Sequence, residues 1–299
     1  MMVFRAAFKH EFLSSVRSRS PQLVVAVFLV LTSISSLIGW LTVRNVTNIY
    51  REILKQGLTK SPNPFAGTNS LYYLRDSVIY VILVGSLMAI VLAAQASLRD
   101  RKSSAELLIK TRNVNLLHRV LGQLAAIGVI IIALEMTALA SSVATIWMIQ
   151  NQTPSVAILV HIMLFGAISG ALMIGVASLS FAFALFAKTE ESALLYPIVT
   201  WATITFTVPQ IITSAHPVAL LNPTPTIATG TGMAQTAVNS LSPFMLMEHF
   251  KSIANALLGI DSSLKLSRLS VFSFGGFVLV SVLASLLISS KSLGSKLNV

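Results

Sequence analysis

The sequence predicts an all-α polytopic membrane protein with six transmembrane helices. Hydrophobic residues make up 55% of the 299 positions and charged residues only 10%, whereas a soluble domain has about 25% charged residues on which to build its surface. The apolar residues are also grouped into long runs, and each run reaches the ~20 residues that cross a bilayer as a helix. We therefore expect one transmembrane domain, residues 1–299, with spans at about 22–43, 77–97, 120–149, 156–187, 193–213 and 269–289.

An amphipathic helix is predicted ahead of the first span. Phe4, Phe8, Phe12 and Val16 recur every four residues, and the basic residues of this segment lie between them. This spacing favours a helix that lies at the inner membrane interface. The alternative is an ordinary basic flank of the first span. No small-residue cleavage site follows the first apolar run, so we expect it to remain as an anchor.

The distribution of positive charge predicts that both termini are cytoplasmic. With the N-terminus inside, 13 of the 21 Lys and Arg residues fall in cytoplasmic segments and 8 in outer ones. Positive residues prefer the cytoplasmic side of membrane proteins. Because these flanking residues account for most of the net charge of +11, we do not expect nucleic acid as a partner.

The loop at 98–119, between the second and third spans, is the most informative segment. It is strongly basic, but it also contains an apolar row that includes Leu107, Leu108 and Ile109. This pattern predicts an amphipathic helix that docks against a cytoplasmic partner. The alternative is a solvated positive loop whose charges only set the orientation of the chain.

The outer segment 214–268 is the least regular part. Prolines and glycines interrupt its first half, and a helix is predicted to resume over residues 241–259. Ser242 can cap this helix with Pro243 at its first position, and Gly259 can end it. Three residues argue against a complete span and favour a re-entrant or interfacial helix before the last span: Glu248, His249 and Lys251.

Small residues and prolines mark contacts and irregularities within the spans. The fourth span contains Gly166-x-x-x-Gly170 and Ala171-x-x-x-Gly175, a spacing that lets helices approach closely. The fifth span contains Pro197 and Pro209, and each is expected to kink its helix.

The stretch Arg99-Asp-Arg-Lys-Ser-Ser-Ala-Glu-Leu-Leu108 resembles the same loop in the permease subunits of type-2 ABC exporters. Ser103-Ser104 stands where that family often has Gly-Thr, Asn113-Val-Asn115 where it has Pro-x-Ser, and Gly122-Gln123 where it has Gly-Lys. The outer stretch Ser242-Pro243…His249-Phe250…Ile253…Gly259 is similar to the gliding-motility branch. The architecture also resembles the nitrous-oxide-reductase maturation permease.

The resemblance implies a coupling helix near 99–112 that sits in a groove of a separate ABC ATPase. Two permease copies, as a homodimer or heterodimer, would join two ATPases in a bacterial or archaeal cytoplasmic membrane and export a substrate by alternating access. An extracytoplasmic accessory protein would handle the substrate outside. ATP and Mg²⁺ would sit on the ATPase, because this sequence has no Gly-x-x-x-x-Gly-Lys-Ser/Thr loop; we expect no cofactor or metal and no enzymatic activity in the chain itself. The implied ATPase-coupling residues are Asp100, Arg101, Glu106, Leu107 and Leu108.

Glu135 lies in the middle of the third span. A carboxylate at this depth is costly and marks a candidate functional residue. It could bind a cation or relay a proton, or it could be a protonated structural group bonded to Thr137 or Ser141; both readings stay open. We therefore keep two alternatives to the exporter function. One is a membrane scaffold that anchors another soluble protein, and the other is an ion-coupled carrier that uses Glu135.

Overall fold

The computed structural model describes residues 2–59, 61, 69–102, 116–151, 153–187, 189–226, 240–260 and 266–295. Every regular element within these ranges is helical. Six helical segments are long and apolar enough to cross a membrane, which confirms the predicted fold class and indicates an integral membrane protein. They are Gln22–Lys55, Ser70–Arg99, Leu117–Ile149, Val156–Phe186, Glu190–Thr213 and Arg268–Ile288.

The chain builds these segments from both regular and irregular helices. The elements up to the third span are α1 (Met2–Arg17), α2 (Arg19–Lys55), the 3-10 helix η1 (Ser70–Leu74), α3 (Ser77–Tyr80), the π-helix η2 (Val81–Gly85), α4 (Ser86–Lys102) and α6 (Leu116–Gln150). The later elements are α7 (Val156–Phe186), α8 (Glu190–Ala202), the π-helix η3 (Thr203–Thr207), α9 (Val208–Thr213), the 3-10 helices η4 (Ala219–Leu221) and η5 (Ser242–Phe244), α11 (Leu246–Leu258) and α12 (Arg268–Ser295).

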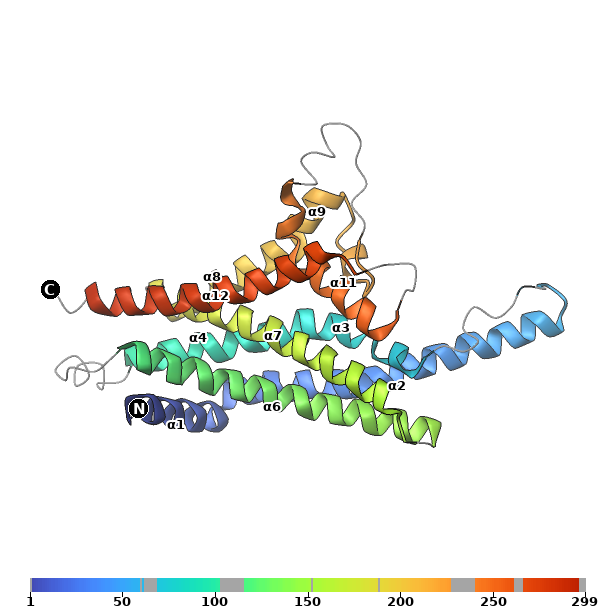
Figure 1. Ribbon diagram of the computed structural model, residues 1–299, viewed down its shortest axis with the longest axis horizontal. Coiled ribbons are helices and arrows are strands. Elements are labelled where there is room, and N and C mark those ends of the chain that lie inside the picture. Colours follow the sequence, from blue (N-terminus) through green and yellow to red (C-terminus); the bar gives the residue numbers. More distant parts are fainter. Residues whose placement is uncertain are drawn as a thin grey trace.

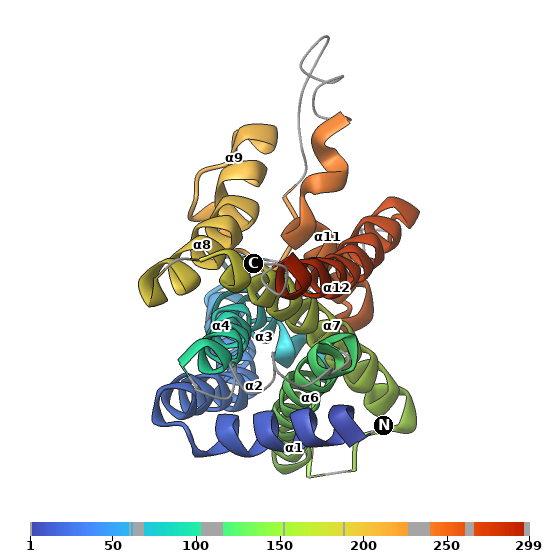
Figure 2. The same cartoon turned by 90° about the vertical axis from the view of Figure 1, so that its left-hand side faces the viewer.

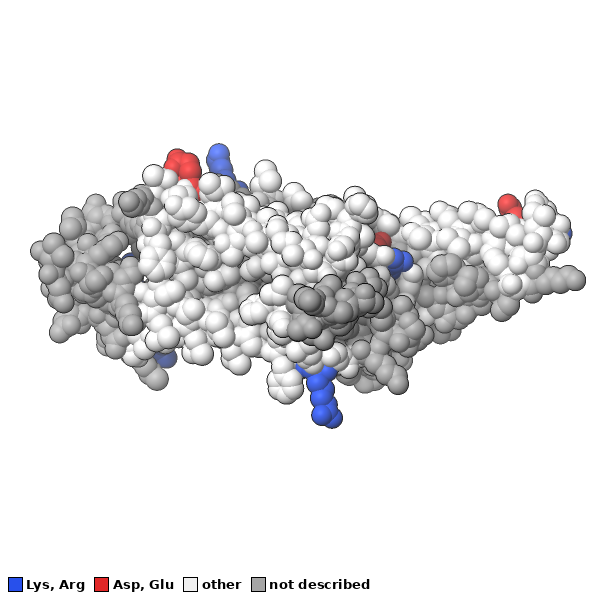
Figure 3. Space-filling model, turned by 90° about the horizontal axis from the view of Figure 1, so that it is seen from above, with Lys and Arg blue, Asp and Glu red and all other residues white. Residues whose placement is uncertain are grey.

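The helices form an elongated bundle in which α7 is central. It packs against α4, α6, α8, α11 and α12, while α8 and α9 lean away from the bundle axis (Figure 1). The face seen in Figure 3 carries only a few scattered charged side chains on its described part. A long surface of this kind, with little charge, suits a protein surrounded by lipid.

Two glycines of α7 allow close packing, but not as one motif. A Cβ atom on Gly166 would overlap the Leu139 side chain of α6, and one on Gly175 would lie 2.8 Å from the Phe277 ring of α12. A Cβ atom on Gly170 would meet nothing within 4 Å. The two glycines therefore serve two different neighbouring helices, one on each side of α7.

Helix α2 is longer than the sequence pattern predicted. Residues 44–55, expected to belong to an outer loop, continue the helix to Lys55, so α2 projects beyond the other helices (Figure 1). This part contains no Gly or Pro, and Arg51, Glu52 and Lys55 are good helix formers. The chain leaves the helix at Gly57, whose φ of 72° is the left-handed conformation typical of helix ends.

The expected kink at Pro209 takes the form of a π-helix. Proline has no N–H to donate to the carbonyl four residues earlier, here that of Thr205, and η3 surrounds that residue. Pro197, in contrast, lies inside α8 without ending it. The second span contains a π-helix as well, and the Trp201 indole N–H donates to the Ile82 carbonyl of that segment at 3.3 Å. This hydrogen bond links η2 to the last turn of α8, directly before η3.

Helix α11 ends as predicted but begins differently. Gly259 closes it with a φ of 62°. Ser242 does not cap it, contrary to the prediction, because Ser242 and Pro243 form the separate turn η5 and α11 starts at Leu246. Met245, with φ −78° and ψ 58°, interrupts the helical backbone between the two elements.

Candidate functional site

One end of the bundle gathers the parts that the sequence assigned to the cytoplasm. Helix α4 ends there, α6 and α8 begin there, and α1 runs across the ends of the longer helices (Figures 1 and 2). The predicted coupling loop follows α4 at this end. Asp100 and Arg101 belong to the last turn of α4, whereas Glu106, Leu107 and Leu108 lie outside the described residues.

Helix α1 packs closely on α6 at one glycine, and its phenylalanines stack on one another along the helix. Phe4, Phe8 and Phe12 stack in sequence with ring centroids 6.3 and 6.1 Å apart. At Gly122 of α6, an added Cβ atom would lie 2.7 Å from the Phe4 carbonyl oxygen and 3.1 Å from the Phe8 nitrogen. The two backbones can approach this closely only because the residue at the contact has no side chain.

An ion pair joins α1 to the end of α4. Glu11 is 1% exposed and pairs with Arg99. The Ser15 hydroxyl donates to Glu11 Oε1 at 2.9 Å, and Arg99 Nη2 donates to Ser15 Oγ at 2.8 Å. An ion pair with further hydrogen bonds of this kind offsets the cost of burying the carboxylate. Arg99 is also the residue directly before Asp100, so the ion pair lies at the start of the predicted coupling segment.

Sequence reasoning missed this group of residues. It placed Phe4, Phe8, Phe12 and Val16 on an apolar face at the membrane interface and assigned no role to Glu11 and Ser15; in the structure Val16 is 51% exposed, whereas Glu11 and Ser15 are buried. A signal was present, because Glu11 and Ser15 lie three residues after Phe8 and Phe12, on the same helical face. An acidic residue on a helical face with packed aromatic residues is a candidate for a buried ion pair.

A polar cleft opens beside this ion pair. Its volume is about 470 Å³, and Ser18, Gln95, Arg99, Glu190 and Glu191 are among the residues that line it. The two glutamates occupy the first turn of α8, where Thr189 and Ser192 form a reciprocal capping box. Negative side chains are favourable at a helix N-terminus. The cleft thus presents charges of both signs at the end of the bundle.

Glu135 is buried in the middle of α6, at 4% exposure. The partners expected from the sequence are wrong: Thr137 donates to the Ala133 carbonyl, and Ser141 bonds to Ser33 and to the Ala138 carbonyl. Ser169 of α7 lies near the carboxyl group. However, Glu135 Oε2 and Ser169 Oγ make no hydrogen bond of normal geometry with any described residue.

The opposite half of the bundle contains a buried ionic cluster on α11. Lys251 Nζ lies 2.7 Å from Glu248 Oε1 and donates to the Leu220 carbonyl at 2.6 Å. Glu248 Oε2 accepts the Thr226 backbone N–H at 2.6 Å. The two side chains are only 2% and 5% exposed. The cluster therefore holds the segment around η4 against α11.

His249 bonds on both sides of its ring. Its Nε2 lies 2.8 Å from the Ser242 carbonyl oxygen, and its Nδ1 lies 3.1 Å from Ser270 Oγ. Burial lowers the pKa of His249 from its usual range, and the hydrogen bond to Ser242 and the nearby Glu248 oppose this effect. The neutral ring, which can donate from Nε2 and accept at Nδ1, therefore joins η5 to the start of α12.

Comparison with models of known protein families found no match, and comparison with curated protein sequences found none either. Among the described residues, no three His, Cys, Asp or Glu side chains are grouped as metal ligands would be.

Proposed function

We propose that this chain is the membrane-spanning permease subunit of an ATP-driven ABC exporter. In this proposal both termini are cytoplasmic, and the basic segment between α4 and α6 contacts a separate ABC ATPase that carries ATP and Mg²⁺. The observation that carries the proposal is the common location of the end of α4, the start of α6 and α1 at one end of a six-helix bundle (Figure 1). The predicted coupling segment is thereby flanked by helices that contact the rest of the bundle.

The ion pair between Glu11 and Arg99 supports this proposal mechanically. Arg99 directly precedes the coupling segment, Glu11 belongs to α1, and α1 packs on α6 through Gly122. A displacement of the segment by an ATPase would therefore move α1, α4 and the start of α6 together. Rigid-body movement of packed helices is a recognised way to alternate access to a binding site. A second copy of the chain would complete the transport pathway.

The first experiment is an affinity purification from mild detergent, followed by mass spectrometry. We expect an ABC ATPase to co-purify in a stoichiometric amount. In the reconstituted complex, Glu106→Arg, or Leu107→Asp combined with Leu108→Asp, should leave membrane insertion intact and uncouple ATP hydrolysis from transport. Glu52→Arg is the matched control, because this exposed glutamate lies on the projecting part of α2. Normal coupling in the 106–108 variants, or purification without an ATPase, would refute the proposal.

One observation favours a second candidate function. Glu135 is a buried carboxyl group whose Oε2 has no partner among the described residues, and an ionisable side chain of this kind often belongs to an ion or proton pathway. The chain would then be an ion-coupled carrier. Transport that requires an ion gradient, is indifferent to ATP and is abolished by Glu135→Gln would select this function over the exporter.

A further inference from the structure

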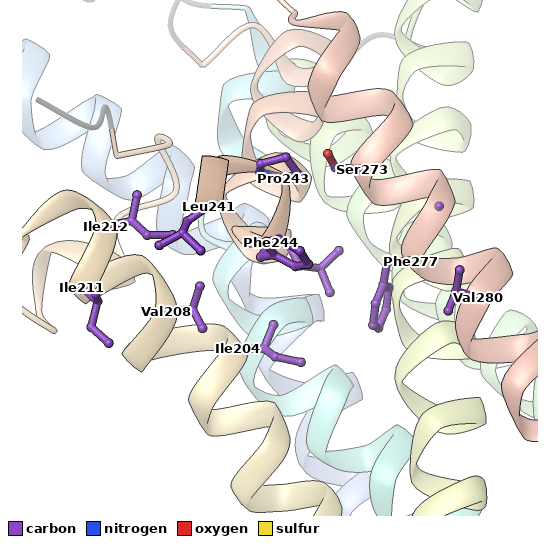
Figure 4. Close-up of a pocket in the computed structure, with 12 residues that line it drawn as sticks. Ile204, Val208, Ile211, Ile212, Leu241, Pro243, Phe244, Ser273, Phe277 and Val280 are labelled. Atoms are coloured by element: carbon purple, nitrogen blue, oxygen red, sulfur yellow. The ribbon is translucent and has the colours of Figure 1, made fainter. Parts of the chain in front are cut away.

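A wide apolar groove separates the last two candidate spans. It has a volume of about 610 Å³ and lies between the η3–α9 segment on one side and α12 on the other. Ile204, Val208 and Ile212 contribute to the first wall, Gly276 and Phe277 to the second, and Phe244 points between them (Figure 4). Among the described residues of the lining, Ser273 is the only polar one.

The position of the groove decides which molecules can reach it. Both walls belong to segments long and apolar enough to cross a membrane, Glu190–Thr213 and Arg268–Ile288, and these two are the least buried of the six. The rim residues Ile211 and Val280 are 71% and 65% exposed. In a bilayer the groove therefore opens sideways into hydrocarbon, where the surrounding molecules are acyl chains and water is excluded.

We propose that this groove is a binding site for an acyl chain of a bilayer lipid. The lipid belongs to the leaflet on the side of α11, which is the outer leaflet if the N-terminus is cytoplasmic. The apolar lining offers an acyl chain continuous contact, whereas its described residues offer a polar headgroup only the Ser273 side chain. A volume of about 610 Å³ is within the range of sites that bind small molecules. The site does not depend on coupling to an ATPase.

The closed end of the groove favours a flexible chain over a helix of a second copy. Leu241, Pro243 and Phe244 border the groove on the side of α11. His249 fixes this turn by bonding to the Ser242 carbonyl and to Ser270 at the start of α12. From Ser273 to Val280 the groove follows α12 for only about 10 Å. A spanning helix would have to continue past the turn, whereas an acyl chain can end against it.

Two adjacent glycines of α12 provide a matched pair of variants. A Cβ atom added to Gly275 or Gly276 would meet nothing within 4 Å, so the space permits a side chain at either position. Only Gly276 lines the groove. Gly276→Phe therefore fills the site, while Gly275→Phe adds the same ring at the next position, outside the groove lining. Ile211→Trp provides a second blocking variant, because it enlarges an exposed residue of the rim.

The test uses the full chain in liposomes that contain a phosphatidylcholine with a photoreactive diazirine near the end of one acyl chain. After illumination, mass spectrometry should find lipid attached within residues 204–212 and 276–280. In Gly276→Phe and Ile211→Trp we expect this labelling to fall at least about tenfold, because the loss of two buried methylene groups alone costs about that factor. Gly275→Phe should label like the unaltered chain.

Two results would overturn the proposal. One is equal labelling of the groove in the blocked variants and in the unaltered chain. The other is efficient cross-linking of two copies through a single cysteine at Gly276→Cys, which would identify a second copy of the chain as the occupant. The chain contains no other cysteine, so such a cross-link has only one interpretation. Neither result would affect the test for the ATPase.

Discussion

Replacing Lys251 by methionine is the most direct test of the buried ionic cluster. The change removes the ammonium group and keeps a side chain of similar length. It leaves the Glu248 carboxylate buried at 5% exposure with the Thr226 N–H as its remaining described partner, and it removes the donor to the Leu220 carbonyl. Both ions are almost fully buried, so solvent does not screen the pair. Removal of one partner of such a pair typically costs about 3–5 kcal/mol of unfolding free energy.

A double variant separates the ion pair from the surrounding packing. Glu248→Gln combined with Lys251→Met removes both charges and keeps an amide oxygen that can accept the Thr226 N–H. The Leu220 carbonyl and the new amide NH2 group then have no described partner, at about 1–3 kcal/mol for each group left unpaired, but no charge remains buried. We therefore expect the double variant to be more stable than Lys251→Met alone. The difference in unfolding free energy between the two variants measures the cost of burying the Glu248 carboxylate without its partner.

The assay is unfolding in mixed micelles at pH 7, in which added SDS is titrated and followed by tryptophan fluorescence. Trp201 lies in α8, next to the segment that packs on α11. Lys55→Met is the control, because Lys55 is exposed at the end of α2 and its loss should change stability by no more than about 0.5 kcal/mol. A cost below about 1 kcal/mol for Lys251→Met, or a double variant less stable than the single one, would refute the reasoning.

Two further predictions concern other contacts. Because burial lowers the pKa of His249, the folded protein holds fewer protons there than the unfolded chain. Its unfolding free energy should therefore fall as the pH is lowered through about 6.5. His249→Gln should flatten this part of the plot of stability against pH, and an unchanged plot would contradict the prediction. Gly122→Ala should loosen α1, since its Cβ would lie 2.7 Å from the Phe4 carbonyl oxygen, and trypsin should then cleave faster after Arg17. Gly128→Ala, where the nearest atom is 3.9 Å away, should not change that rate.

The sequence predicted the fold class because apolar run length and the near absence of charge act over ~20 residues at a time. The end of α2 was missed because the length of an apolar run indicates only which residues cross the hydrocarbon core. A helix can continue beyond that core into water. The residues beyond position 43 include no Gly or Pro before Gly57, so nothing stops the helix until that point. The π-helix before Pro209 was predicted only as a kink, since the missing N–H fixes the site of the defect but not its form.

The candidate site was less predictable, because its contacts join residues far apart in the sequence. The pairing of Glu11 with Arg99 spans 88 positions, and the bond from Lys251 to the Leu220 carbonyl spans 31. Periodicity can place Glu11 on the packed face of α1, but it cannot name the partner. Likewise, local spacing suggested Thr137 and Ser141 as partners of Glu135, whereas the polar side chain near its carboxyl group, Ser169, comes from the neighbouring helix α7.

The partners of the buried ionisable side chains separate structural from functional candidates. Glu248, His249 and Lys251 bond to one another, to backbone carbonyls and to the Ser270 hydroxyl, and these bonds hold η4, η5 and α12 around α11, so their burial is explained by architecture. Glu11 is likewise satisfied by Arg99 and Ser15. Glu135 differs, because one of its oxygens is buried without a hydrogen bond to any described residue. Burial of such a carboxyl group lowers the stability of the fold, and no described residue offsets this cost with a hydrogen bond to Glu135 Oε2. A function in transport would explain why the carboxyl group is present. Glu135→Gln therefore tests transport, whereas Lys251→Met tests folding.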